Sequence, residues 1–140
     1  MEIKLAEDDQ EIQECYSVMA ELRPHVSVEA FLPRVRKQME TAGYRLAYVR
    51  DGEVKAVAGF RVSDCLAWGR FVYVDDLVAK SDERSKGYGG ALFDWLVGHA
   101  RQEGCDQFHL DSGVHRFDAH RFYLTKRMFI EAHHFGLKLK

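Results

Sequence analysis

The chain has 140 residues, 46% of them hydrophobic and 12% aromatic, which is enough for one well-packed domain and too few for two ordinary ones. We therefore expect a single domain over residues 1–140. The formal net charge is −2, from 20 basic and 22 acidic residues. This balance excludes an overall basic field that would hold a nucleic acid or an anionic membrane surface.

The cysteines Cys15, Cys65 and Cys105 are odd in number and show no CxxC spacing. The beginning of the chain, "MEIKLAEDDQ", is polar and acidic, so we expect no signal peptide. No apolar run approaches the roughly 20 residues that a membrane span requires. These features favour a soluble protein of a reducing cytoplasm.

The first part of the chain predicts a short strand and two helices. "EIKLA" alternates like a strand, and the following residues up to about Pro24 show helical spacing after an acidic start. A second helix is predicted with Ser27 as its N-cap and Gly43 as its stop. Pro33 falls inside this pattern, and we expect it to break the helix or to delay its start.

The middle of the chain predicts a β-hairpin and a further strand. "YRLAYVR" and "EVKAVAGFRVS" flank Asp51-Gly52, which is a strong signal for two antiparallel strands. A turn around "DCLAWG" leads to "RFVYVDDLVAK", whose Val, Phe and Tyr residues favour a fourth strand.

After the fourth strand the pattern predicts a helix to about Gly104, a strand at "DQFHLDS" and a helix at "DAHRFYLTKRM". "FIEAHHFGLKL" at the end predicts a terminal strand or hairpin. Because a helix connects the fourth and fifth strands, those two strands should be parallel, with a right-handed crossover.

The segment "RSKGYGGAL" places three glycines where this helix begins. Free N–H groups and the aligned peptide dipoles at a helix start form an anion site. Gly87, Gly89 and Gly90 would let a phosphate approach the backbone, while Arg84 and Lys86 would add full charges at the rim. The alternative is a simple turn with a fraying helix start.

Two known phosphate motifs are excluded at this segment. Walker A requires Gly-Lys followed by Ser or Thr, an order that "SKGYGG" lacks. A dinucleotide fingerprint that begins at Gly87 would need a glycine where Leu92 stands. We therefore expect neither a magnesium-bound nucleoside triphosphate nor a classical NAD.

Arg84-x-x-Gly87-x-Gly89, after a strand that reads "VDDLVA", resembles the acyl-CoA-binding motif of the GNAT N-acetyltransferase superfamily. The order of the expected elements is also similar to the GNAT fold from near Glu2 to Leu139. "AHRFY" at residues 119–123 resembles the later Ala-x-x-Phe-Tyr helix of that family. The resemblance implies an α/β fold of the α+β type, with a mixed, mostly antiparallel sheet, a splayed parallel pair of strands four and five, and helices on both faces.

The resemblance also implies the function: transfer of an acetyl group from acetyl-CoA to a primary amine of a small molecule, or of a peptide or protein, by direct attack in a ternary complex, without a metal. In the family the pyrophosphate of CoA binds the backbone of the glycine loop, and the pantetheine arm binds the backbone of strand four. The implied cofactor-binding residues are Leu77, Val78, Ala79, Arg84, Ser85, Lys86, Gly87, Tyr88, Gly89 and Gly90.

The thioester would then point toward Asp75, Asp76 and Tyr123. An amine of pKa about 10.4 becomes nucleophilic at pH 7 at a cost of about 4.6 kcal/mol, and a carboxylate can remove its proton directly or through a water. The two carboxylates point to opposite faces of a regular strand, so only one of them would act as the base. A bulge typical of the family in this strand leaves open which of the two it is. By resemblance to polyamine-acetylating members, Asp75 is the first candidate and Asp76 the second.

Two alternatives stay open for these residues. Adjacent carboxylates repel each other, which would raise at least one pKa and attract a cationic amine, but Asp76 can instead be a structural carboxylate. Tyr123 matches the position of the acid that protonates the leaving thiolate, but a Tyr in this sequence context is also a typical core residue. Many relatives have Gly-Phe where this chain has Met128-Phe129, so an easy left-handed stop is lost.

The remaining polar residues give weaker indications of function. The histidines show no HExxH framework, so we expect no metal. His115 and Asp118 are candidate contacts of the acceptor. We expect no nucleic-acid or membrane partner, and a homodimer is one expected assembly because family members are often dimers. The rival functions are an acyl-CoA-binding sensor without turnover and a nucleotide-binding regulatory domain.

Overall fold

The computed structural model describes residues 1–140 apart from the side chain of Ser85. Two compact units make up the chain, Met1–His109 and Leu110–Lys140. Among the described residues, no helix is both long enough and apolar enough to cross a membrane.

A single five-stranded sheet has its strands in the order of the sequence. The strands are β1 (Glu2–Leu5), β2 (Arg45–Asp51), β3 (Glu53–Cys65), β4 (Gly69–Ala79) and β5 (Gln107–Leu110). The pairs from β1 to β4 are antiparallel, and β5 runs parallel to β4. The predicted mixed, mostly antiparallel sheet is therefore confirmed.

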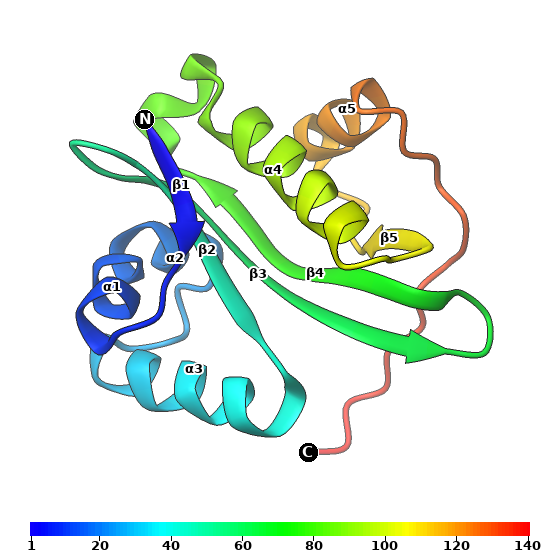
Figure 1. Ribbon diagram of the computed structural model, residues 1–140, viewed down its shortest axis with the longest axis horizontal. Helices are drawn as coiled ribbons and strands as arrows, with labels where there is room; N and C mark the ends of the chain where they lie inside the picture. The colour runs from blue at the N-terminus through cyan, green and yellow to red at the C-terminus, as the bar shows by residue number, and fades with distance from the viewer. The chain divides into compact units, whose positions relative to one another are not determined.

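Helices cover both faces of this sheet within the first unit, as predicted (Figure 1). These helices are α1 (Asp9–Glu14), α2 (Tyr16–Leu22) and α3 (Val28–Ala42) on one face and α4 (Tyr88–Gln102) on the other. A short 3₁₀ helix, η1 (Ser81–Lys86), precedes α4, and the second unit contains α5 (Phe117–Thr125).

The central strands are buried on both faces because neighbouring residues pack against different helices. Leu46 and Tyr48 belong to the cluster under α1, α2 and α3. Phe60 faces α4, where its ring meets that of His99 at 5.5 Å between centroids. Burial on both sides explains why β2 and β3 read as nearly continuous apolar runs.

The strongest local signals of the sequence form as predicted. Gly52 has φ 78° in the turn between β2 and β3, and Gly43 ends α3 with φ 68°. The hydroxyl of Ser27 accepts a hydrogen bond from the N–H of Ala30 at the start of α3. Glycine fits these two turns because other residues are strained at positive φ.

Two predictions about the helices are wrong. The single helix expected before Pro24 is divided at Cys15, whose N–H donates to the carbonyl of Ile12 and tightens the last turn of α1. Pro33 neither breaks nor delays α3, which starts at Val28 and continues through it. A proline near the start of a helix removes one hydrogen bond, and the Ser27 cap supplies another.

The predicted terminal strand or hairpin is also wrong. Residues 129–140 form no helix or strand in the structure, and their large apolar side chains are exposed. Alternating apolar residues make a strand only when a partner strand completes the hydrogen bonds. The left-handed stop whose glycine is missing forms nevertheless, because Arg127 adopts φ 69° directly after α5.

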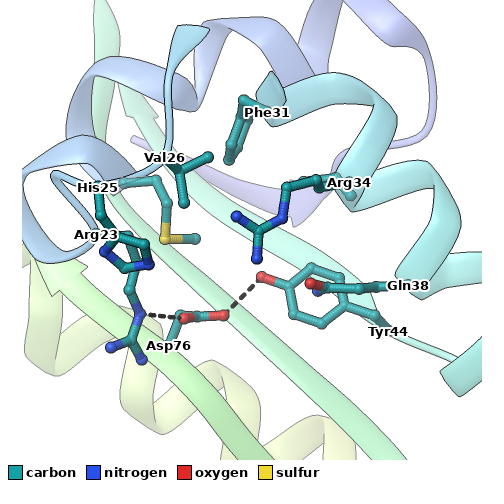
Figure 2. Close-up of a pocket in the computed structure, with 10 residues that line it drawn as sticks. Arg23, His25, Val26, Phe31, Arg34, Gln38, Tyr44 and Asp76 are labelled. Atoms are coloured by element: carbon teal, nitrogen blue, oxygen red, sulfur yellow. Dashed lines mark hydrogen bonds and ion pairs between the residues drawn. The ribbon is translucent and has the colours of Figure 1, made fainter. Parts of the chain in front are cut away.

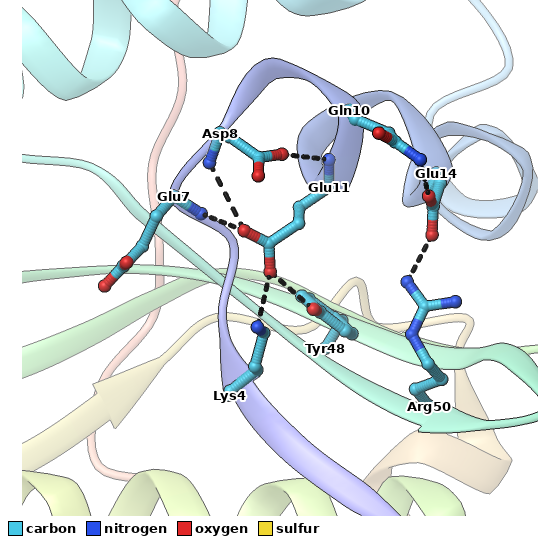
Figure 3. Close-up of polar contacts among 8 residues, drawn as sticks. All are labelled: Lys4, Glu7, Asp8, Gln10, Glu11, Glu14, Tyr48 and Arg50. Atoms are coloured by element: carbon cyan, nitrogen blue, oxygen red, sulfur yellow. Dashed lines mark hydrogen bonds and ion pairs between the residues drawn. The ribbon is translucent and has the colours of Figure 1, made fainter.

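A polar cluster anchors α1 on the sheet (Figure 3). The carboxylate of Glu11 accepts hydrogen bonds from the Tyr48 hydroxyl at 2.6 Å and from the backbone of Glu7 and Asp8, and it pairs with Lys4 at 3.0 Å. The Tyr48 hydrogen bond, followed by that of Lys4, lowers the pKa of Glu11 to about 2. Glu11 is thus ionised in the folded protein even in mild acid.

Candidate active site

A β-bulge in β4 sets the directions of Asp75 and Asp76. In the pairing with β3, Gly59 lies opposite Asp76 and Phe60 lies opposite Val74, so Asp75 is the extra residue. Because a bulge interrupts the alternation of side chains, both carboxylates line one cavity. The alternation expected of a regular strand is thus interrupted here, as the bulge typical of the family suggested.

Asp75 is held by Arg61 of β3. The guanidinium donates from Nε and Nη2 to the two carboxylate oxygens, at 2.8 and 2.9 Å. This two-point geometry is the strongest that an arginine and a carboxylate form. The backbone carbonyl of Asp75 also accepts a hydrogen bond from Arg23, at 2.8 Å.

Asp76 is held by two donors from the face of the sheet that α1, α2 and α3 cover (Figure 2). Arg23, at the end of α2, donates from Nε to one oxygen at 2.9 Å, and the Tyr44 hydroxyl donates to the other at 2.8 Å. The side chain of Asp76 is only 13% exposed. Burial, and then the negative charge of Asp76, raises the pKa of Tyr44 well above its usual value, so Tyr44 stays a neutral donor.

The acidic pair therefore differs electrostatically from the pair expected from the sequence. Each carboxylate has an arginine of its own, so the pair does not present two uncompensated negative charges to a cationic amine. Sequence reasoning missed Arg23, Arg61 and Tyr44. The one signal that could have found Arg61 is its place on the strand that pairs with β4.

Two adjoining cavities open in front of these residues. One has a volume of about 140 Å³ and the other about 320 Å³. The residues that line both are Arg23, Gln38, Tyr44 and Asp76. His25 and Arg34 line the first cavity, while Arg61 and Asp75 line the second. We refer to the two cavities together as the recess in front of the bulge.

The carboxyl-terminal half of β4 extends beyond β5. The two strands begin together, where the Asp106 N–H donates to the Arg70 carbonyl at 2.7 Å. However, β5 has 4 residues and β4 has 11. Leu77, Val78 and Ala79 therefore pair with β3 on one side and lie past the end of β5 on the other.

The glycine segment forms a left-handed turn into α4. Gly87 has φ 83° and caps the helix, and the first helical hydrogen bond joins the Ala91 N–H to the Gly87 carbonyl. The N–H groups of Tyr88, Gly89 and Gly90 thus precede the helical ladder. A Cβ on Gly89 would lie 3.6 Å from the Cβ of Ala79, so the turn packs closely on the end of β4.

The side chains around this turn are partly committed to other contacts. Lys86 pairs with Glu83 at 2.7 Å, and Arg84 donates from Nε to the Ala79 carbonyl at 3.4 Å. The Tyr88 hydroxyl donates to Asp51 at 2.6 Å. The side chain of Ser85, also predicted as a cofactor contact, lies outside the described part of the structure.

Tyr123 lies on α5, in the second unit. Burial raises the pKa of its phenol, and the positive charge of Arg116 lowers it by less. The group is therefore protonated at neutral pH, as an acid must be. In the same unit the candidate acceptor contact Asp118 is exposed and pairs with Arg121 at 3.3 Å.

The structure does not favour other catalytic groups. Among the described residues, no group of three His, Cys, Asp or Glu side chains is placed to hold a metal ion. Burial raises the pKa of Cys105 and, to about 12, that of Cys15, which disfavours a thiolate nucleophile at either position.

Comparison with known proteins identifies the family to which the chain is related. The profile of the acetyltransferase (GNAT) family matches residues 9–128. The uncharacterized N-acetyltransferase YhdJ of Bacillus subtilis is 35% identical over 121 residues, which are 86% of this chain and 85% of the relative. Aminoalkylphosphonate N-acetyltransferase of Salmonella typhimurium is 34% identical over 84 residues, which are 59% of this chain and 54% of that protein.

A solved structure shows the same fold at low sequence identity. Ribosomal-protein-alanine N-acetyltransferase of Brucella melitensis superposes with a TM-score of 0.83 at 17% identity, over 99% of this chain and 100% of that one. The family match covers most of the chain, and the YhdJ relative is matched along most of its length. The chain therefore belongs to the GNAT family of acetyltransferases.

Proposed function

We propose that the protein transfers the acetyl group of acetyl-CoA to a primary amine of a small molecule by direct attack within a ternary complex. The amine nitrogen attacks the thioester carbonyl carbon, and the carbon–sulfur bond breaks. Of the two protons that an ammonium must lose to become an amide, one reaches the solvent and the other ends on the sulfur of CoA. No covalent bond to the enzyme forms.

Acetyl-CoA would lie along the end of β4 and the start of α4. The backbone N–H groups of Tyr88, Gly89 and Gly90 would hold the pyrophosphate, with the helix dipole behind them. Arg84 and Lys86 would contribute charge at the rim, and Ser85 belongs to the same loop. The backbone of Leu77, Val78 and Ala79 would hold the pantetheine arm. Gly89 and Gly90 suit the binding of the pyrophosphate because they have no side chain that would cover their backbone N–H groups.

The proposed base is Asp75, with Asp76 as the second candidate. The side chain of Asp75 is 30% exposed and that of Asp76 is 13% exposed, so a water or an amine reaches Asp75 more easily. All four carboxylate oxygens already accept one hydrogen bond from Arg23, Arg61 or Tyr44. Proton removal would therefore use a remaining lone pair, directly or through a bound water.

Tyr123 is the proposed acid for the leaving thiolate. Its support is the family resemblance together with a phenol that stays protonated at neutral pH. A thiol of pKa near 8.5 leaves more readily when a positioned group protonates its sulfur.

The acceptor class rests on the recess in front of the bulge and on the Salmonella relative. That relative is named for an aminoalkylphosphonate, which is a small amine. The observation that carries the proposal is the bulge itself, because it directs two carboxylates into a recess beside the strand end that leads to the glycine turn.

The test is a screen of primary amines for release of free CoA thiol that depends on acetyl-CoA. The expected result is release with at least one small amine and a product heavier than that amine by one acetyl group. Binding of acetyl-CoA without turnover of any amine in the screen would favour the rival sensor function instead.

A second measurement separates the nucleotide-binding rival. Acetyl-CoA, ATP and NAD are compared by thermal unfolding of the whole chain. A ligand present at about 100 times its Kd stabilises the folded state by about 2.7 kcal/mol, so acetyl-CoA should raise the melting temperature while ATP and NAD leave it unchanged. Stabilisation by ATP or NAD alone would overturn the proposal.

A further inference from the structure

The recess in front of the bulge has more arginines than carboxylates. Its charged lining residues are Arg23, Arg34, Arg61, Asp75 and Asp76. Three guanidinium groups against two carboxylates leave one positive charge in excess among these five side chains. A recess with this balance is better suited to an acceptor that carries a negative group than to a simple cation.

The excess charge belongs to Arg34. Arg61 is bound at two points by Asp75, and Arg23 is shared between Asp76 and the carbonyl of Asp75. The side chain of Arg34 has no ion pair or hydrogen bond with any residue whose side chain the structure describes. In Figure 2 its guanidinium extends from α3 into the recess, toward the Tyr44 hydroxyl and Asp76.

Two further polar groups beside Arg34 are also uncommitted. His25 and the side-chain amide of Gln38 line the recess, and neither side chain hydrogen-bonds to another described residue. The amide of Gln38 supplies N–H donors, and a ring nitrogen of His25 supplies another. Together with the guanidinium they match the acceptor oxygens of a phosphonate, phosphate or carboxylate group.

The position of these donors fits a short molecule with an acid at one end and an amine at the other. The first cavity has Arg34 on its lining, the second has Asp75, and Asp76 and Tyr44 line both. An acid group held at Arg34 would thus leave an amine a few bonds away, facing the carboxylates of the bulge.

We infer that Arg34 is the binding residue for an anionic acid group on the acceptor, so that the substrate is a small amino acid-like compound with a phosphonate, phosphate or carboxylate. This inference rests on the proposed acetyl transfer for the amine end, but the anion site itself can be tested by binding. Arg34 would select the substrate and would take no part in the proton transfers.

The first experiment compares 2-aminoethylphosphonate, β-alanine and n-propylamine as acceptors. The three have a primary amine at a similar distance from a phosphonate, a carboxylate or a methyl group. We expect kcat/KM to be at least about 10-fold higher for one of the two acids than for n-propylamine, because hydrogen bonds to charged groups are strong. Preference for n-propylamine over both acids would overturn the inference.

The second experiment removes the charge with Arg34→Gln. We expect KM for the preferred acid to rise about 10-fold to 100-fold, with kcat and the KM of n-propylamine little changed. Lys37→Gln is the matched control, because it removes one positive charge from an exposed position on the same helix. An equal rise in KM for the acid in Arg34→Gln and Lys37→Gln would contradict a specific anion site. An equal loss of kcat/KM for the acids and for n-propylamine in Arg34→Gln would contradict it as well.

Binding without turnover keeps the two proposals separable. Methylphosphonate and acetate have the acid groups but no amine, so they test Arg34 even if no amine is acetylated. We expect one of them to raise the melting temperature of the wild type and of Lys37→Gln but not of Arg34→Gln. Lack of any shift with the wild type would overturn the anion site, and acetylation of n-propylamine in the same preparation would leave the acetyltransferase function intact.

Discussion

The hydroxyl of Tyr44 reaches Asp76 by passing over Gly59, the residue opposite Asp76 on the neighbouring strand. A Cβ built on Gly59 would lie 1.7 Å from the Tyr44 hydroxyl oxygen. The glycine therefore leaves the room that the phenol needs to reach its acceptor. Three positions distant in the sequence are thus coupled at the bulge.

Gly59→Ala should destabilise the protein by about 2–4 kcal/mol, because the buried Tyr44 ring must move and its hydrogen bond to Asp76 is lost. The measurement is the free energy of unfolding in denaturant. Gly98→Ala in α4 is the control, since no atom outside its local backbone would lie within 4 Å of the new Cβ. That variant should be stabilised by about 0.5–1 kcal/mol, and equal effects at both glycines would show that Tyr44 does not depend on Gly59.

Asp75→Asn and Asp76→Asn should separate a base from a structural carboxylate. We expect Asp75→Asn to lower kcat about 100-fold or more with little loss of stability, because it removes the more accessible carboxylate. Asp76→Asn should cost about 1–3 kcal/mol of unfolding free energy, because it weakens the acceptor of the buried Tyr44 and of Arg23. A larger loss of kcat in Asp76→Asn, after correction for the unfolded fraction, would reverse the assignment.

Features built from neighbouring residues could be predicted from the sequence. The Asp51-Gly52 turn and the helix stop at Gly43 are local events, and both form where the sequence places them. The glycine segment likewise leads into α4 as expected. In each case the backbone geometry depends on one or two residues whose conformational preference is strong.

The arginine partners of the bulge could not be predicted in the same way. Arg23 and Asp76 are 53 positions apart, and nothing in either local sequence specifies the other. The prediction of a strand in residues 129–140 was wrong for the opposite reason. The local alternation of apolar residues favours a strand there, but the structure gives the segment no strand partner. Long-range pairing, whether of charges or of strands, depends on the fold as a whole.

Gly87→Ala should weaken the binding of acetyl-CoA. Its φ of 83° is strained for alanine by about 1–2 kcal/mol, so the turn should relax and move the N–H groups at the start of α4. We expect KM for acetyl-CoA to rise about 10-fold. Gly104→Ala is the control, because it has φ 73° and equally open surroundings at the other end of α4. It should lose similar stability at unchanged KM, and a matching rise in its KM would mean that strain alone causes the effect.

Glu11→Gln should remove part of the acid sensitivity of the protein. The folded pKa of Glu11 is about 2, below its usual value of 4.5, so its contribution to stability is complete above pH 4.5 and is lost as the pH falls toward 2. We expect the free energy of unfolding of the wild type to exceed that of Glu11→Gln by about 1–2 kcal/mol at pH 6, after allowance for solvent screening. This difference should become smaller as the pH falls to 2.

Glu40→Gln is the control for the loss of a carboxylate, because it removes an exposed one from α3. Its free energy of unfolding at pH 6 should stay close to that of the wild type. A difference between the wild type and Glu11→Gln that does not change with pH would contradict the role of the Tyr48 and Lys4 contacts in lowering the pKa of Glu11.

Tyr123→Phe should lower kcat about 100-fold while KM for acetyl-CoA changes little, if the phenol protonates the leaving thiolate. Tyr16→Phe makes the same chemical change at a hydroxyl that donates to the Val26 carbonyl, so it should cost about 1 kcal/mol of stability and leave kcat unchanged. Burial raises the pKa of Tyr123 above its usual value of 10, so the phenol is almost fully protonated up to about pH 9. The wild-type kcat should accordingly show no loss from this group below about pH 9. An unchanged kcat in Tyr123→Phe would exclude the phenol as the acid and leave solvent water to protonate the thiolate.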